Sequence, residues 1–373
     1  MDYFFEVLRI IDGAINQDYS KVVAFAKTFA SKLEDSGDLA AAKKVRAMLS
    51  QSKTLELTAS RGTAITAIPV DSESKLSLAT REEFRDGDIA LFHDNETSHK
   101  INKFIKYIKN SNDLALKGLE LNPSLLLYGP PGCGKSETAK FIASKLNLPL
   151  VTARLDSLIS SYLGSTSKNL RALFNFADHE RCVLFLDEFD AIAKVRDDSH
   201  ELGELKRVVV SLLQNIDQLD DGTVLIAATN HDHLLDSAVW RRFSYKLKID
   251  LPGIEQRENI FRHNLQMLPK RSDYAKFSEL SNGLSGSDIK SLCNEIKRDA
   301  AIENKKNIES SSVIKEIIFQ RFNFELQKKN QNDQMKFIRS TLGKSITLEN
   351  IADMYGVSKG TVSNLLREAH ESN

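Results

Sequence analysis

The apolar residues of this chain follow two patterns, one typical of buried strands and one typical of helices. Short apolar runs end at small or polar residues, as in strands that are covered on both faces. Between these runs, apolar residues recur every three or four positions, as on one face of a helix. This alternation predicts an α/β fold with a parallel sheet between two layers of helices. The predicted strands are Leu125–Tyr128, Leu148–Thr152, Val183–Asp187, Val224–Ala228 and Leu247–Ile249.

Regions of purely helical spacing flank this predicted α/β domain, which covers residues 87–253. Residues 1–51 predict an N-terminal helical domain, whose small size suits a docking module, an oligomer-supported cap or a packing appendage. Residues 52–86 lose periodicity and are rich in Ser and Thr, which indicates a linker. Residues 254–328 predict a separate small helical domain, and residues 329–373 predict another helical unit.

A glycine-rich stretch connects the first predicted strand to a helix. Glycines allow backbone N–H groups to turn toward phosphate oxygens at the positive N-terminus of a helix. Lys135 is expected to reach the β- and γ-phosphates, and the Ser136 hydroxyl is expected to bind Mg²⁺. An ordinary strand-to-helix turn can also contain glycines, but the full spacing and the Lys-Ser pair favour a nucleoside triphosphate. The predicted binding residues are Gly129, Pro130, Pro131, Gly132, Cys133, Gly134, Lys135, Ser136 and Glu137.

Two adjacent acids, Asp187 and Glu188, end the third predicted strand. In open α/β sheets, ligands bind at the carboxyl ends of the strands. Asp187 is therefore predicted to bind the nucleotide through Mg²⁺, together with Ser136. Glu188 is predicted to polarise the attacking water, because transfer of a γ-phosphoryl group depends on orientation and electrostatics.

Two later features stay open when only their residue types are considered. Asn230 follows the fourth strand and would set an amide near the γ-phosphate, although an isolated Asn is usually a turn residue. Arg241 and Arg242 follow a predicted helical turn, and a solvated basic pair is the simpler interpretation.

Composition and charge exclude several classes of function. Lys plus Arg and Asp plus Glu both number 51 in 373 residues, so no net charge steers the molecule toward polyanions. No apolar run approaches the roughly 18 residues of a membrane span, and the N-terminus lacks the pattern of a signal peptide. Cys133, Cys182 and Cys293 have neither metal-binding nor disulfide spacing. We therefore expect a cytoplasmic protein that does not contact membranes.

Taken together, these residues resemble the AAA ATPases, most closely the branch that contains katanin, spastin and the ESCRT disassembly ATPase. Beyond the phosphate loop and the acidic strand end, the resemblance is carried by Leu225–Asn230, Leu235–Phe243 and Gly283–Ile289. It implies ATP and Mg²⁺ as cofactors, a ring that is commonly a hexamer, and a helical lid over residues 254–328.

The same resemblance assigns roles to the residues left open above. It implies that Asn230 senses the γ-phosphate and that Arg241 and Arg242 reach the γ-phosphate bound by the neighbouring subunit. Trp240 departs from the pattern of that branch, which usually carries another arginine at this position. It therefore stays open which of the two arginines contributes more at the γ-phosphate of the neighbouring subunit.

A second feature of the resemblance is the first pore loop, which contacts an extended polypeptide. Its predicted residues here are Tyr162, Leu163 and Gly164. A tyrosine ring offers a flat apolar face that can contact substrate side chains without reading their sequence. On sequence statistics alone, an aromatic residue followed by Leu-Gly more often lies at the edge of a core. Residues 196–204 are expected to supply a second pore loop.

Residues 345–367 look like a helix-turn-helix, with a turn at Gly356 and a helix cap at Ser358. Residues 332–373 carry five basic and five acidic side chains, so one copy should bind DNA weakly. DNA contact and protein docking are both open for this unit. The residues that could face a major groove are Lys359, Thr361, Ser363, Asn364 and Arg367.

The expected function is that of an ATP-hydrolysing ring that remodels or unfolds proteins by pulling polypeptide through a central pore. The alternative is a DNA-associated ATPase, such as a regulator or loader, targeted by the C-terminal helices. The chain also resembles bacterial AAA ATPases encoded beside subtilisin-like serine proteases in anti-phage operons. That resemblance implies a separate serine protease as a partner. The sequence itself contains no His-Glu-x-x-His pattern, so any degradation must come from another polypeptide.

Overall fold

The computed structural model describes most of the chain. The described residues are 7–11, 19–38, 40–46, 67–71, 74–119, 122–154, 158, 163–193, 202–219, 222–265, 271–305 and 307–371.

A six-stranded sheet in the order β1-β3-β4-β5-β2-β6 forms the centre of the α/β unit. All neighbouring strands from β3 to β6 are parallel, which confirms the predicted fold class. The middle of β2, β4 and β5 is an uninterrupted apolar run, as expected for strands covered on both faces, whereas the edge strand β6 alternates between lysine and larger apolar or aromatic residues. These strands are β2 (Ser124–Tyr128), β3 (Leu150–Ala153), β4 (Val183–Leu186), β5 (Val224–Thr229) and β6 (Tyr245–Lys248).

The edge strand β1 (Ala79–Glu82) lies inside the linker predicted over residues 52–86, so that prediction is wrong for its last part. β1 pairs antiparallel with β3, with Ala79 opposite Ala153. The preceding Leu78 is fully buried in the core that β3 also lines. The α/β unit therefore begins before residue 87.

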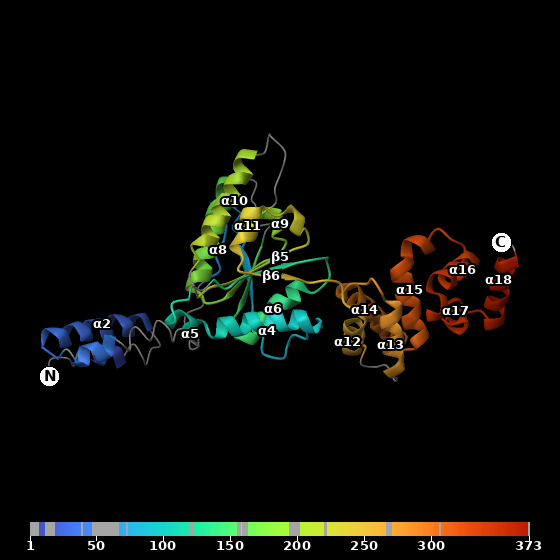
Figure 1. Cartoon of the computed structure of the whole chain (residues 1–373), viewed down its shortest axis with the longest axis horizontal. Helices are drawn as coiled ribbons and strands as arrows, with labels where there is room; N and C mark the ends of the chain where they lie inside the picture. Colours follow the sequence, from blue (N-terminus) through green and yellow to red (C-terminus); the bar gives the residue numbers. More distant parts are fainter. Residues whose placement is uncertain are drawn as a thin grey trace.

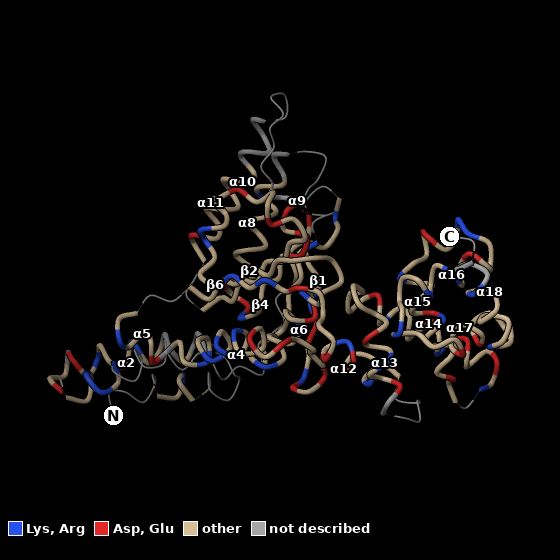
Figure 2. The backbone as a smooth tube through the Cα atoms, turned by 45° about the vertical axis from the view of Figure 1, so that its right-hand side comes forward, with Lys and Arg blue, Asp and Glu red and all other residues tan. Residues whose placement is uncertain are grey.

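Helices cover both faces of the sheet (Figure 1). Leu125 and Leu127 of β2 pack with α4 and α6 on one face, whereas Leu126 packs with α8 and α10 on the other. This alternation follows from the two-residue period of a strand. α4 contains four lysines, coloured blue with the other basic residues in Figure 2, and all four are exposed. The helices of the unit are α4 (Asn95–Lys109), α5 (Ser111–Leu116), α6 (Lys135–Leu146), α8 (Leu163–His179), α9 (Asp190–Ala193), α10 (Leu202–Asp217), η1 (Asp232–Leu234) and α11 (Ser237–Arg242).

The N-terminal region contains α2 (Tyr19–Asp35) and a second helical segment over residues 40–46. The Arg46 guanidinium donates to both carboxylate oxygens of Glu34, at 2.7 and 2.8 Å. The chain therefore turns back on itself between these two segments. None of the described helices combines the length and apolar content that a membrane span requires.

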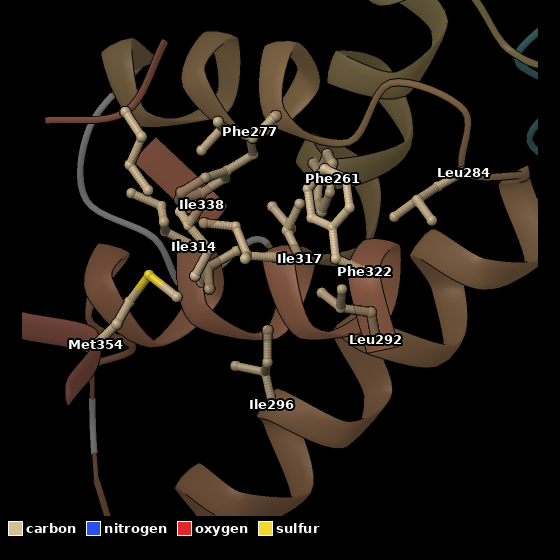
Figure 3. Packing of buried hydrophobic residues seen from close by; sticks show 14 of the residues in the cluster. Phe261, Phe277, Leu284, Leu292, Ile296, Ile314, Ile317, Phe322, Ile338 and Met354 are labelled. Atoms are coloured by element: carbon tan, nitrogen blue, oxygen red, sulfur yellow. The ribbon is translucent and has the colours of Figure 1, made fainter. Parts of the chain in front are cut away.

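The helices after the sheet share one hydrophobic core (Figure 3). Phe261 and Phe277 from the first helices and Met354 from near the C-terminus belong to the same buried cluster. The boundary predicted between residues 328 and 329 falls within this shared core. The helices are α12 (Ile254–Asn264), α13 (Arg271–Leu280), α14 (Gly286–Ile302), α15 (Ser310–Leu326), α16 (Gln331–Leu342), η2 (Gly343–Ser345), α17 (Leu348–Tyr355) and α18 (Lys359–Glu371).

A shared core predicts that damage in α17 destabilises α13 and α14 as well. Ile351 is fully buried in this core, so Ile351→Ala should lower the free energy of unfolding of the unit by about 2–5 kcal/mol. Hydrogen exchange should then accelerate in α13 and α14 as well as in α16 to α18. Asp353→Ala, an exposed change on the same helix, is the matched control. Faster exchange confined to α16–α18 would show that the C-terminal helices are an independent domain.

Candidate active site

The phosphate loop connects β2 to α6 through a backbone that only glycine adopts easily. Gly129, Gly132 and Gly134 all have positive φ angles, at +139°, +73° and +94°. A Cβ atom on Gly129 would also lie 2.1 Å from the backbone oxygen of Ile249, which follows β6. The glycines are thus required both by backbone conformation and by the close approach of a neighbouring segment.

Lys135, the first residue of α6, lies almost buried at the centre of the loop. Its Nζ donates hydrogen bonds to the backbone oxygens of Gly129 and Pro130, both at 2.8 Å, and to Oδ1 of Asn230 at 2.6 Å. Burial lowers the pKa of the Lys135 ammonium. The structure therefore brings the predicted Asn230, at the end of β5, into direct contact with the predicted lysine.

Ser136 and Asp187, the two residues predicted to bind Mg²⁺, lie in direct contact. Ser136 Oγ donates to Asp187 Oδ2 at 2.8 Å, across the gap between the start of α6 and the end of β4. A hydroxyl and a carboxylate are the hard oxygen donors that Mg²⁺ prefers, and both are half-buried. The pair fits Mg²⁺, and these two oxygens would hold the ion beside the phosphate loop.

Glu188 follows Asp187 and is exposed. Its φ of +48° lies in the left-handed region, which non-glycine residues rarely adopt and which costs of order 1–3 kcal/mol. Two hydrogen bonds hold this turn: Glu188 N donates to Asp187 Oδ1 at 2.9 Å, and Phe189 N donates to the backbone oxygen of Ala228 at 2.8 Å. Backbone strain of this kind is typical of functional turns.

Asp190 is a site residue that the sequence reasoning missed. Its Oδ1 accepts a hydrogen bond from Thr229 Oγ1 at 2.7 Å, and Thr229 Oγ1 accepts one from His231 N at 3.0 Å. These contacts fix the end of β4 against the end of β5, on either side of Asn230. The only signal in the sequence is a third carboxylate, three positions after Asp187.

A cavity of about 160 Å³ opens beside the loop, between the sheet and α12. His93 lines it and was not singled out in the sequence. Its Nε2 lies 2.8 Å from Thr138 Oγ1, and because that hydroxyl donates to the Gly134 oxygen, the His93 Nε2–H is the donor. Burial lowers the pKa of His93, which favours the neutral form of its ring. The lining also includes the apolar residues Phe92, Ile249, Leu251 and Ile260 and the polar residues Asp94, Thr97, Asp250 and Gln256.

The helical region after the sheet contacts the phosphate loop directly. The backbone N–H of Ser287, in the first turn of α14, donates to the oxygen of Gly132 at 3.0 Å. A Cβ atom on Gly132 would lie 2.4 Å from Ser285 Oγ, so the two segments are in close contact. A capping box between Ser285 and Asp288 fixes this start of α14.

The two arginines of α11 have different surroundings. Arg242 donates from Nε and Nη2 to the carboxylate of Asp217, both at 3.1 Å, and from Nη1 to the Ala238 oxygen at 3.0 Å. Arg241 is exposed and has no hydrogen bond or ion pair with any described residue. Trp240 packs edge-to-face on Tyr128 of β2, with ring centroids 5.1 Å apart. Trp240 therefore anchors α11 to the sheet.

The predicted pore loop is only partly described. Tyr162 lies outside the described residues, and Leu163 and Gly164 form the first turn of α8. Most of the second predicted pore loop, over residues 196–204, also lies outside them.

Residues 125–251 match the family described as "ATPase family associated with various cellular activities (AAA)". An AAA family ATPase of Sinorhizobium fredii is 42% identical over 205 residues, which cover 55% of this chain and 62% of that protein. Proteasome-activating nucleotidase 1 of Haloferax volcanii is 35% identical over 200 residues, covering 51% of this chain and 49% of that protein.

Further similarity extends to an ATP-dependent zinc metalloprotease, FtsH, of Thermus thermophilus, which is 30% identical over 222 residues and covers 57% of this chain and 36% of that protein. The chain spans at most about three-fifths of the length of these curated relatives. The crystal structure of the FIGL-1 AAA domain has the same fold, with a TM-score of 0.53, 23% identity, and coverage of 64% of this chain and 84% of that one. Loop geometry, sheet order and these similarities together identify an AAA-family ATPase domain over residues 125–251.

Proposed function

We propose that this chain is an ATP-driven protein remodeller that works as a ring and pulls polypeptide through a central pore. The observation that carries the proposal is the placement of Arg241. α11 packs through Val239 into the core on the α8 side of the sheet, whereas α6, which begins at Lys135, packs into the core on the opposite side (Figure 1). An exposed arginine on the layer opposite the phosphate loop is suited to a nucleotide bound by another copy.

In this proposal each site residue acts on the triphosphate or on water. Lys135 neutralises the β- and γ-phosphates, and Asn230, now its hydrogen-bond partner, orients the terminal phosphate. Mg²⁺, held by Ser136 and Asp187, would neutralise charge on the phosphate oxygens. Glu188 accepts the proton of the attacking water from its strained turn.

The polypeptide substrate is proposed from the predicted pore residues and from the relatives. Two of these relatives are named for proteasome activation and for ATP-dependent proteolysis. A ring that places Tyr162 of every copy at its centre would grip an extended chain through its apolar ring face. A separate serine protease would then cut the unfolded product, and the proposed setting is anti-phage defence in the cytoplasm.

Replacing the proposed general base tests the hydrolytic site. Glu188→Gln should keep ATP binding and lower kcat by about 10²–10⁴-fold, because general base catalysis contributes about this much. Steady-state phosphate release and binding of a fluorescent ATP analogue measure the two quantities separately. Glu349→Gln, at an exposed position of α17, is the charge-matched control. A kcat within threefold of the unchanged protein would exclude Glu188 as the base.

The two arginines should differ, because only Arg241 lacks an internal partner among the described residues. Arg241→Ala should lower kcat by about 10³–10⁵-fold, the contribution of such a group in related phosphoryl transfers. Arg242→Ala should lower kcat less than Arg241→Ala, because Arg242 acts only by holding α11 in position through Asp217. Asp217→Ala should therefore lower kcat by the same amount as Arg242→Ala.

Mixing subunits distinguishes a contribution across subunits from one within a subunit. A mixture of Arg241→Ala and Lys135→Ala chains should recover ATPase activity. The Arg241→Ala chain supplies an intact phosphate loop and the Lys135→Ala chain supplies an intact Arg241, so some subunit boundaries contain both. Each variant alone should be inactive, and specific activity of the unchanged chain should rise with protein concentration. No recovery in mixed rings would contradict the proposed role of Arg241.

The pore residue separates the remodeller from the alternative, a DNA-associated regulator or loader. Tyr162→Ala should leave basal ATP hydrolysis within about twofold of the unchanged protein. It should abolish ATP-dependent unfolding of a tagged fluorescent protein, because the tyrosine side chain is proposed to contact only the polypeptide substrate. Tyr162→Phe, which keeps the ring, is the control and should retain unfolding. Full unfolding activity in Tyr162→Ala would refute pore-driven translocation by this residue.

A further inference from the structure

One exposed side of α18 has no role in the site described above. It contains Lys359, Thr361, Asn364 and Arg367, which are all exposed, and we call these four residues the α18 face. Val362, on the other side of the helix, is fully buried in the shared core. The segment from Lys359 to Arg367 carries two cations and no carboxylate, although the C-terminal unit as a whole has balanced charge.

The turn before α18 fixes the direction of this face. α17 ends at Gly356, with φ of +64°, and the next residue, Val357, donates through its N–H to the Ala352 oxygen at 3.0 Å. Ser358 Oγ then accepts from Thr361 N at 3.1 Å and starts the following helix. Two packed helices joined by a three-residue turn are the arrangement in which a second helix can enter the major groove of DNA.

The surface chemistry favours a nucleic acid over a protein partner. The centre of a protein-binding surface is typically apolar and poor in charge, whereas DNA-binding surfaces are polar and cationic. Among the described residues from Gln331 to Arg367, no large hydrophobic side chain is exposed. Exposed large apolar side chains do occur on the neighbouring helices, at Ile302 and Phe324.

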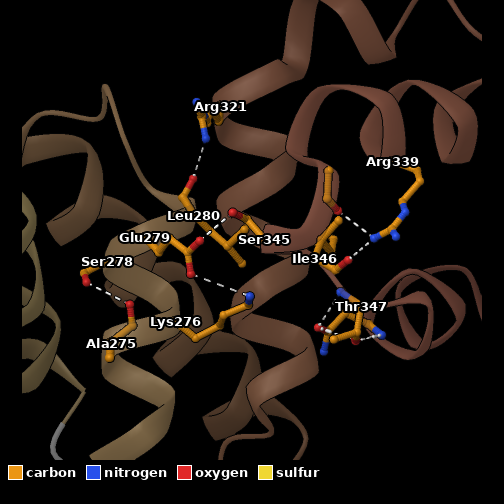
Figure 4. Close-up of polar contacts among 12 residues, drawn as sticks. Ala275, Lys276, Ser278, Glu279, Leu280, Arg321, Arg339, Ser345, Ile346 and Thr347 are labelled. Atoms are coloured by element: carbon orange, nitrogen blue, oxygen red, sulfur yellow. Dashed lines mark hydrogen bonds and ion pairs between the residues drawn. The ribbon is translucent and has the colours of Figure 1, made fainter.

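The segments that precede α18 are hydrogen-bonded to α13, a helix of the same unit as α14 (Figure 4). Ser345 Oγ, in the segment before α17, donates to Glu279 of α13, and Arg321 of α15 donates to the Leu280 oxygen at 2.9 Å. Phe322 of α15 and Phe337 of α16 pack edge-to-face at 5.6 Å. A body held by a continuous core and by such bonds moves as one unit.

This unit ends at the phosphate loop, where α14 contacts Gly132. A shift of α14 that accompanies nucleotide binding would therefore displace the α18 face as well. By linkage, any ligand of the α18 face that distinguishes the two positions must change the affinity for nucleotide by the same factor.

We propose that the C-terminal helices bind duplex DNA through the α18 face, and that this binding is coupled to nucleotide binding at the phosphate loop. Lys359 and Arg367 contact phosphates or base edges, and Thr361 and Asn364 donate and accept hydrogen bonds in the groove. Two cations give weak binding for each copy, and several copies in a ring add to the total affinity. The inference does not depend on a polypeptide substrate.

The test measures binding of a fluorescein-labelled mixed-sequence duplex of about 30 base pairs, three helical turns, to the full chain by anisotropy at low salt. Lys359→Gln combined with Arg367→Gln should weaken binding about tenfold or more and reduce the slope of log affinity against log salt by about 2 per engaged copy. Lys290→Gln combined with Arg298→Gln removes the same charge from exposed positions of α14 and should change little. Thermal melting of both double variants shows that they fold.

The coupling is tested with Glu188→Gln, with and without Mg²⁺-ATP. Duplex affinity should change at least about fivefold between the two states, the lower end of allosteric coupling, and duplex should change ATP affinity by the same factor. No duplex binding, equal loss in both folded double variants, or equal affinity in both nucleotide states would overturn the proposal. The proposal would also be overturned if an unfolded polypeptide displaced the duplex and its binding depended equally on Lys359 and Arg367. The α18 face would then be a protein-binding surface.

Discussion

The hydrogen bonds of the Lys135 ammonium hold the nucleotide site together. A nearly buried cation needs partners for its donors, and here they come from the Gly129 and Pro130 oxygens and from Asn230 Oδ1. These bonds connect the phosphate loop to the end of β5, a strand that lies beside β2 in the sheet. A phosphate oxygen at this lysine would replace some of them, so the position of Asn230 depends on what the lysine binds.

The parts of the site that depend on local sequence could be predicted from it. The loop, Lys135, Ser136 and Asp187 are determined by spacing within a strand–loop–helix unit and at one strand end, and the structure brings them together. β1 could not be found in this way, because the segment Ala-Thr-Arg-Glu has no apolar pattern and becomes a strand only by pairing with β3. His93 and Asp190 were missed for a related reason, since their hydrogen-bond partners lie 45 and 39 residues away.

Periodicity also fails to show which helices share a core. Every amphipathic helix after residue 254 has an apolar side, and the pattern does not state which neighbour covers it. Here Ile317 of α15 belongs to one cluster with Phe277 of α13 and Ile351 of α17. A helical region and a C-terminal unit that look separable in the sequence therefore form one hydrophobic core, and a displacement of one requires a displacement of the other.

α11 shows how a short helix can present one free cation with little loss of entropy on binding. Six residues are too few for a stable isolated helix, so tertiary contacts must hold it. Asp236 caps its start, Trp240 packs on Tyr128, and Arg242 is bound by Asp217. Because the backbone is fixed from three directions, Arg241 would lose only its own side-chain freedom on binding a phosphate of another copy, the role proposed for it. One arginine of this helix thus holds its position through Asp217, while its neighbour, Arg241, is exposed.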